Sequence, residues 1–305
     1  MNRRKFLTTS GVGLVTSGVA LSTGLLSAQE SAAFEAKQDG PILLSMKGGM
    51  CREGKTLEEK FVLLKKLGYD GIELDSPGGQ NKTEALAASK KTGLPIHGVV
   101  DSIHWRACLS DPSEVIREKG LQGLLAAIRE SHSVGGSTVL LVPGVAKGKV
   151  TQKEAWDRSI IEIRKALPLA ARLGIHILIE NVWNGMFYDP KGGNAQSANL
   201  LAKYLDEINS PWVGSYFDIG NHQKFGKPAD WIRTLGKRIV KLDVKDWGGK
   251  NGFCKIGEGD VDWPDVRKAL AEINYTGWAT AEVSGGKADR CAEILANMRK
   301  HLLGK

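Results

Sequence analysis

The sequence is poor in the features that mark several large classes of protein. Its 305 residues include only four cysteines, none in a C-x-x-C pair, and this spacing does not fit a structural zinc site. No run after the N-terminal segment approaches the about 20 apolar residues of a membrane-spanning helix. The lysines and arginines are spread along the chain without a basic run, which argues against a nucleic-acid partner. Hydrophobic residues at 42% and charged residues at 25% exclude a disordered, collagen-like or coiled-coil chain.

The cysteines also leave the disulfide state open. A chain of this length buries a large core without needing disulfides. The four thiols, Cys51, Cys108, Cys254 and Cys291, allow three pairings in an oxidising compartment, and the sequence does not choose among them.

The first 28 residues read as a targeting segment rather than as part of the fold. Arg3-Arg4-Lys5-Phe6-Leu7 resembles the twin-arginine export signal, and a charge-free stretch, too short to be a stable membrane span, follows it. Ala28 then offers a small residue before a cleavage point. We therefore expect a signal peptide at 1–28, a short extension at 29–40, and a bacterial periplasmic or extracytoplasmic protein without membrane insertion after export. Removing the three signal cations lowers the net charge from +8 to +5.

Strand-like and helix-like segments alternate eight times in the remaining chain. Short, β-branched apolar runs lie between longer segments of helical periodicity, such as Leu57 to Leu67, which Gly68 ends. The predicted strands are 42–46, 71–74, 96–100, 138–142, 175–180, 213–218, 239–243 and 278–283. No G-x-G-x-x-G follows the first strand, which argues against a doubly wound open sheet. The pattern predicts an α/β protein with a single (β/α)8 TIM barrel at 41–303.

Acidic residues recur where the predicted strands end, on the catalytic face of such a barrel. They are Glu73, Glu180, Asp218, Asp243 and Glu282, and Asp246 lies beyond the seventh strand. Five acids on one rim raise one another's pKa and cannot all be ionised without cations. A divalent metal ion resolves this conflict, and oxygen ligands favour Mn, Mg or Co over Zn.

Several motifs in this order resemble the xylose isomerase-like TIM-barrel superfamily of sugar and sugar-phosphate isomerases and epimerases. They are Leu67-Gly-Tyr-Asp-Gly-Ile-Glu-Leu74, Ile179-Glu-Asn-Val-Trp183, Phe217-Asp-Ile-Gly-Asn-His222, Val244-Lys-Asp246 and Gly257-Glu-Gly-Asp-Val-Asp-Trp263. The resemblance implies metal ligands at Glu180, Asp218 and Glu282. The fourth ligand, usually a histidine after the seventh strand, is Asp243 here. Either Asp243 also binds the metal, or it faces the core and three ligands remain.

The resemblance also implies roles around the metal. Glu180 and Glu282 would be the catalytic base and acid, and a substrate pocket would include His104, Trp105, Trp183, His222 and Lys245. Glu73 and Asp246 remain as further rim acids, while His132 and His176 are interpreted as structural. The glutamate in Gly257-Glu258-Gly259 argues against strong phosphate binding and favours a neutral sugar.

These features predict a metal-dependent sugar isomerase or epimerase that works by proton transfer through an enediolate. Two alternatives stay open: a lyase or hydrolase-type enzyme on 3-keto glycosides, and a carbohydrate-binding barrel without catalysis. An endonuclease of the histidine-rich, multi-zinc type fits poorly with six histidines. The expected partner is a small carbohydrate, and the sequence leaves homo-oligomer formation open.

Overall fold

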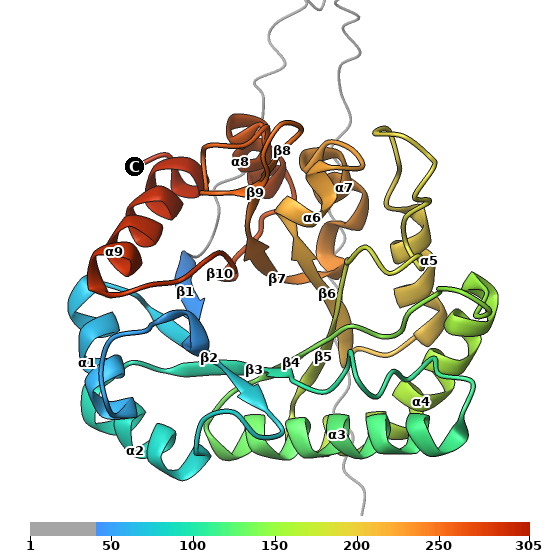
Figure 1. Cartoon of the computed structure of the whole chain (residues 1–305), viewed down its shortest axis with the longest axis horizontal. Helices are drawn as coiled ribbons and strands as arrows, with labels where there is room; N and C mark the ends of the chain where they lie inside the picture. The colour runs from blue at the N-terminus through green and yellow to red at the C-terminus, as the bar shows by residue number, and fades with distance from the viewer. Residues whose placement is uncertain (1–40) are drawn as a thin grey trace, which may run out of the picture. The chain divides into compact units, whose positions relative to one another are not determined.

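The computed structural model describes residues 41–305, so the predicted signal peptide and extension lie outside the described residues. Within this range eight parallel strands close into a barrel in the order β1-β10-β7-β6-β5-β4-β3-β2, with helices around it (Figure 1). The predicted single (β/α)8 barrel is confirmed. Its strands are β1 Ile42–Lys47, β2 Gly71–Ser76, β3 Ile96–Asp101, β4 Thr138–Leu141, β5 His176–Glu180, β6 Val213–Asp218, β7 Ile239–Val244 and β10 Gly277–Ala281.

The helices on the outside bury one apolar face against the strands. They are α1 Leu57–Leu67, α2 Lys82–Thr92, α3 Glu114–Ser133, α4 Gln152–Leu173, α5 Asn199–Ile208, α7 Pro228–Leu235, α8 Trp263–Glu272 and α9 Ala288–Asn297. Local sequence fixes their ends: Thr56 and Glu59 form a capping box on α1, and Gly68 ends it at φ 96°. Of the helices from residue 41 onward, none combines the length and apolarity needed to cross a membrane.

The barrel interior follows the two-residue period of its strands. Side chains two apart on one strand point the same way, so Tyr216 and Asp218 on β6, and Lys241 and Asp243 on β7, form successive layers. Asp218 lies opposite Asp243 in the register of these strands. Shifts in register at β2–β3 and β6–β7 adjust which residues enter the interior.

The interior layer that contains Tyr216 and Lys241 is polar. Such barrels commonly have branched apolar side chains in their interior layers. One end of the polar layer's hydrogen-bond chain is Lys241, whose Nζ lies 2.5 Å from His97 Nδ1 and 2.6 Å from Thr138 Oγ1. His97 Nε2 lies 2.8 Å from Ser45 Oγ, which lies 2.9 Å from Thr280 Oγ1. From there Tyr216 OH lies 2.7 Å from Thr280 Oγ1 and donates to Glu73 at 3.2 Å. Each buried polar group thereby gains a partner, which offsets the cost of its burial.

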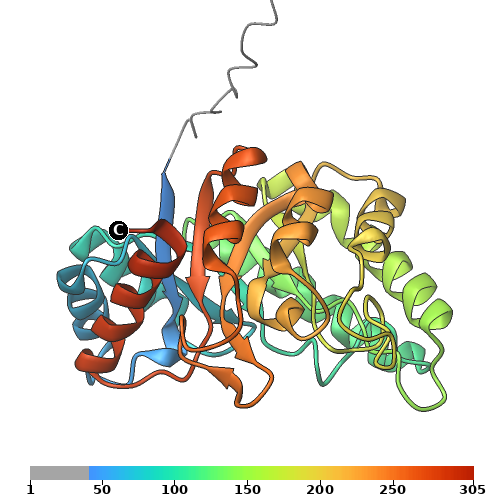
Figure 2. The same ribbon diagram turned by 90° about the horizontal axis from the view of Figure 1, so that it is seen from above.

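A short antiparallel hairpin, β8 (Asp246–Gly248) with β9 (Gly252–Cys254), follows β7 and was not predicted. Figure 2 shows it in orange beside the ends of the barrel strands. Asp246 ties this hairpin to the next loop. Its carboxylate accepts from Gly257 N at 2.8 Å, Val261 N at 3.3 Å and Trp263 Nε1 at 3.0 Å. The rim acid Asp246 is therefore engaged in holding a loop.

We expect Asp246→Ala to destabilise the fold by about 2–4 kcal/mol, because it leaves several buried N–H donors without an acceptor. Urea unfolding followed by circular dichroism measures this difference. The exposed Glu258, in the same loop, supplies the control: Glu258→Ala should change stability by less than about 0.5 kcal/mol. Equal effects of the two substitutions would contradict the anchoring role of Asp246.

Candidate active site at the carboxyl ends of the strands

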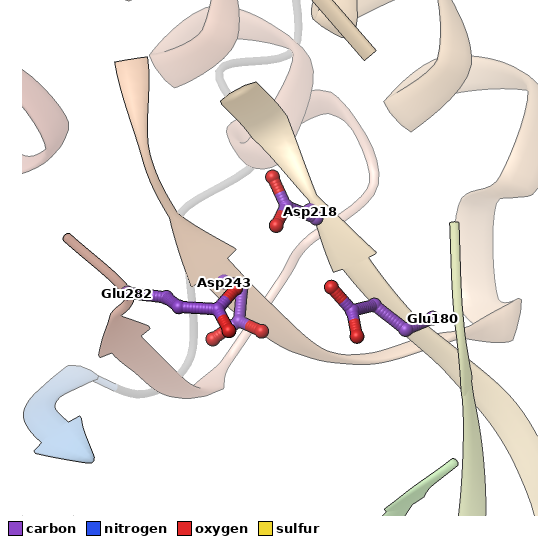
Figure 3. Close-up of side chains that lie close together, drawn as sticks. All are labelled: Glu180, Asp218, Asp243 and Glu282. Carbon is purple, nitrogen blue, oxygen red and sulfur yellow. The ribbon is translucent and has the colours of Figure 1, made fainter. Parts of the chain in front are cut away.

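Four acidic side chains converge at one end of the barrel. Glu180 ends β5, Asp218 ends β6, Asp243 lies one residue before the end of β7, and Glu282 directly follows β10. Each offers a carboxylate oxygen, and these four oxygens all lie within 4.8 Å of one another (Figure 3). The cluster could hold a metal ion, since it presents the oxygen donors that hard divalent cations prefer.

Two lysines reach into the same cluster. Lys47, the last residue of β1, places its Nζ 3.0 Å from Asp243 Oδ2 and 2.8 Å from Glu282 Oε1. Lys245 places its Nζ 2.8 Å from Asp218 Oδ2 and also contacts Glu282 Oε2. Lys245 was predicted from the sequence, whereas Lys47 was not. The sequence contained one indication of its role: Lys47 ends an apolar strand, and a charged side chain in such a place needs a partner.

The two glutamates experience opposite electrostatic environments. Burial and the neighbouring Glu282 raise the pKa of Glu180 to about 8. Burial also works to raise the pKa of Glu282, but Lys47 and Lys245 outweigh it and lower this pKa to about 2. The pKa of Asp243 is raised by burial, despite the opposing effect of Lys47. Without a bound metal ion, Glu282 is therefore the stronger acid of the two glutamates and Glu180 the one that keeps a proton more readily.

Two asparagines position the carboxylates on β5 and β6. Asp218 caps α6 (Ile219–Gln223) by accepting from Asn221 N at 2.7 Å. Asn221 Nδ2 then donates to Glu180 Oε1 at 3.3 Å, while Asn181 Oδ1 accepts from Asp218 N at 2.8 Å. Sequence reasoning missed both asparagines, although each is close in sequence to one of the four acids. They link the two strands that carry Glu180 and Asp218.

His222 lies in an aromatic cluster behind this layer. Its ring centroid is 4.0 Å from that of Trp231 and 5.8 Å from that of Tyr188, and the side chain is fully buried. Burial lowers its pKa to about 3, so the ring is neutral. Helix α6 thus directs Asn221, rather than the predicted His222, toward Glu180.

His104 and Trp105 follow β3 near the acidic cluster. His104 is buried, and its Nδ1 accepts from Val142 N at 3.2 Å. Burial lowers its pKa to about 3, with a further contribution from Lys47, whereas Glu282 acts in the opposite direction. Trp105 is 53% exposed and meets the His104 ring edge-on. His104 therefore lies within electrostatic reach of the cluster, and Trp105 is open to solvent.

Two aromatic rings stack beside Lys245. Trp183 donates through Nε1 to Asn221 O at 2.7 Å, and its ring is parallel to that of Phe253 with centroids 5.1 Å apart. Both rings stay exposed, at 40% and 51%. Phe253 on β9 also lines a cavity of about 300 Å³ with Lys245, Glu282, Lys255, Ser284 and Arg290. An apolar surface and polar groups thus adjoin the carboxylates, as a sugar pocket requires.

The remaining rim acids lie apart from the four. Glu73 is fully buried on β2, where it accepts from Tyr216 in the polar layer. Asp246 holds the loop described above. His176, interpreted as structural, packs its ring against Trp212 at 5.0 Å between centroids.

The fold and these residues define a class: an α/β barrel with a carboxylate-rich site at the carboxyl ends of its strands. A sequence model of the xylose isomerase-like TIM barrel family matches residues 61–301, and the chain belongs to this family. The L-ribulose-5-phosphate 3-epimerase UlaE of Escherichia coli is 26% identical over 261 residues, which cover 81% of this chain and 88% of that protein.

Solved structures resemble most of the chain. D-allulose 3-epimerase from Methylomonas sp. has a TM-score of 0.69 at 19% identity and covers 85% of this chain and 97% of its own. The IOLI protein, in a crystal structure with a zinc atom, has a TM-score of 0.71 at 16% identity, with 86% and 99% covered. At these identities the structural likeness establishes the fold.

We expect Lys47→Met to lower the free energy of unfolding in EDTA by about 3 kcal/mol, because Asp243 and Glu282 lose a shared ammonium partner. Added Mn²⁺ should restore most of this loss by supplying the missing positive charge. Thermal unfolding with EDTA and with Mn²⁺ measures both effects. Lys255→Met is the matched control: it removes an exposed pair with Glu293 and should cost less than about 1 kcal/mol in either condition. An unchanged Tm of Lys47→Met in EDTA would refute the compensating role.

Proposed function

We propose that this chain is a divalent-metal-dependent epimerase that inverts the carbon next to the carbonyl of a ketose. The observation that carries the proposal is the pair of glutamates, Glu180 and Glu282, whose environments drive their pKa values apart within one small cluster. Opposed acid and base groups of this kind are what a two-sided proton transfer needs. The 3-epimerase activity of UlaE supports the same chemistry.

The glutamates divide the proton transfer between them. Glu282, ionised beside two lysines, accepts the proton from the substrate carbon. Glu180, whose pKa burial and Glu282 raise, returns a proton to the opposite face of the resulting enediolate. In the reverse direction their roles exchange, as an epimerase requires. Lys47 and Lys245 hold Glu282 in place and supply positive charge near the oxygens that become anionic.

The four carboxylates fit a hard divalent cation. Asp243 Oδ1 is buried and has no hydrogen-bond partner, which is costly unless a cation completes its environment. Asp243 in place of the family's usual histidine makes the donor set all oxygen, which favours Mn or Mg over Zn. When bound, such an ion acts as a Lewis acid toward the substrate oxygens.

The charge pattern around the site favours a neutral sugar over a phosphorylated one. Lys47 and Lys245 each already contact two carboxylates. Lys255 and Arg290, farther out, share Glu293. In the Gly257-Glu258-Gly259 loop, Gly257 N already donates to Asp246 and is not free for a phosphate. The substrate class we propose is therefore a free ketose, stacked on the Trp183 and Phe253 rings.

We expect purified protein with Mn²⁺ to epimerise at least one member of a panel of free ketohexoses and ketopentoses. In deuterated water the product should carry deuterium at the inverted carbon, because the proton passes through exchangeable carboxyl groups. NMR of the product mixture measures both results. A panel of the corresponding ketose phosphates, run in parallel, tests the charge argument.

The matched variants are Glu282→Gln and Glu293→Gln. Loss of the base should reduce kcat by about 100-fold or more, whereas the outer Glu293 substitution should leave turnover near wild type. Complete retention of the substrate hydrogen would exclude proton transfer. Turnover of phosphates alone would overturn the neutral-sugar assignment, and no turnover of either panel would favour a sugar-binding protein.

We also propose that the chain is exported through its twin-arginine segment, a feature that lies outside the described residues. Arg3→Lys combined with Arg4→Lys should keep the protein in the cytoplasm of a bacterial host. N-terminal sequencing of the wild-type periplasmic fraction should begin close to Gln29. Equal export of both forms would contradict the proposal.

A further inference from the structure

Two buried cysteines face each other where the barrel closes between its first and last strands. Cys51 follows β1 and the short helix η1 (Gly48–Met50), and Cys291 lies in the first turn of α9. Cys51 Sγ donates to Glu53 O at 3.4 Å, Cys291 Sγ lies 3.6 Å from Gly286 O, and each thiol is the largest influence on the pKa of the other. Both residues are almost completely buried. Nothing in the proposed sugar chemistry uses them.

The backbone around this pair is tightly held. Cys51 bridges Gly286 in parallel fashion, with Arg52 N donating to Gly286 O at 2.9 Å and Gly286 N donating to Met50 O at 3.0 Å. The Cys291 thiol donates to the same Gly286 O at 3.6 Å. Tyr69 OH donates to Cys291 O at 2.8 Å. Both cysteines are therefore held at Gly286, Cys51 through its backbone and Cys291 through its thiol.

The other two cysteines have different surroundings. Cys108 donates to Trp105 O at 3.6 Å. Cys254 lies on β9, where burial raises its pKa and nearby acidic side chains raise it further. All four thiols are free in the described structure. Of the three pairings that the sequence leaves open, the shared position of Cys51 and Cys291 at Gly286 favours the one that joins these two.

We propose that Cys51 and Cys291 form a disulfide that closes the barrel covalently between the β1 and β10 segments. The bond would tie the segment that carries Lys47 to the segment that carries Glu282, two residues already paired across the site. It would also close a covalent loop containing most of the barrel, which restricts the unfolded chain strongly.

The oxidant is a small-molecule disulfide such as oxidised glutathione. The Cys51 thiolate attacks one of its sulfurs, forms a mixed disulfide and releases one thiolate. Cys291 gives its proton to solvent, and its sulfur attacks Cys51, which breaks the mixed disulfide and releases the second thiolate. Two protein thiols are thus oxidised by two electrons, and one disulfide is reduced to two thiols. The neighbouring Cys291 lowers the pKa of Cys51 to about 6, which favours Cys51 as the attacking group.

The test uses the full chain with Cys108→Ser and Cys254→Ser, so that only the inferred pair remains. One sample is incubated natively with oxidised glutathione, and a second is refolded from urea in its presence, because the buried sulfurs exchange slowly in the native fold. Non-reducing peptide mapping should identify a Cys51–Cys291 linkage in the monomer. The oxidised protein should unfold at a Tm higher by about 5 °C, and reductant should reverse the shift.

The matched control adds Cys51→Ala to the same background, which removes the pair while circular dichroism checks that the fold persists. This variant should show no intramolecular linkage and no shift of Tm between oxidised and reduced samples. Two free thiols per monomer after both treatments would overturn the proposal. So would a wild-type linkage map in which Cys51 or Cys291 joins Cys108 or Cys254 instead. These measurements do not involve turnover, so they are independent of the proposed epimerase activity.

Discussion

Repulsion among four carboxylates at one end of the barrel is the constraint on which the rest of the site depends. Glu180, Asp218, Asp243 and Glu282 bring their oxygens within 4.8 Å of one another in a largely buried space, where like charges interact strongly. The ammonium groups of Lys47 and Lys245 reduce this repulsion, and so does the raised pKa of Glu180, which favours its protonated form. The charges that stabilise the cluster also give Glu180 and Glu282 different pKa values. The proposed proton transfer needs this difference. Stability and chemistry therefore have a common physical origin here.

The polar layer beneath the carboxylates extends this principle into the barrel. Glu73 and Lys241 are both fully buried, and the chain of hydrogen bonds through Tyr216, Thr280, Ser45 and His97 lies between them. Burial lowers the pKa of Lys241 to about 8, against the attraction of Glu73. Such a network is costly if any member lacks a partner, so it strongly favours one arrangement of the strands. The layer that supports the site is thus specified by hydrogen bonding more than by apolar packing.

The segments that follow β1, β6, β7 and β10 connect this rigid interior to the groups expected to meet a sugar. Lys47 ends the first strand and Cys51 follows it closely, and Glu282 and Gly286 follow the last strand. The hairpin after β7 brings Phe253 onto Trp183, and Asp246 holds that hairpin against the next loop. The site is therefore assembled from chain segments far apart in sequence. Its geometry depends on how well the first and last strands are held together.

Much of the fold was predictable from sequence, because it depends on local periodicity. Strand position pointed to five acids, and the family resemblance separated the four from Glu73. Apolar runs, Gly68 and the capping residues fix where elements begin and end, and a carboxylate at the end of a buried strand is conspicuous. The partners of those acids were not predictable. Lys47 meets Asp243 only because β1 and β7 both flank β10 in the closed barrel. Whether Asn221 or His222 faces Glu180 depends on how α6 turns after its Asp218 cap. The pairing of Cys51 with Cys291 likewise needs the closure of the first strand on the last, a long-range contact that no local pattern records.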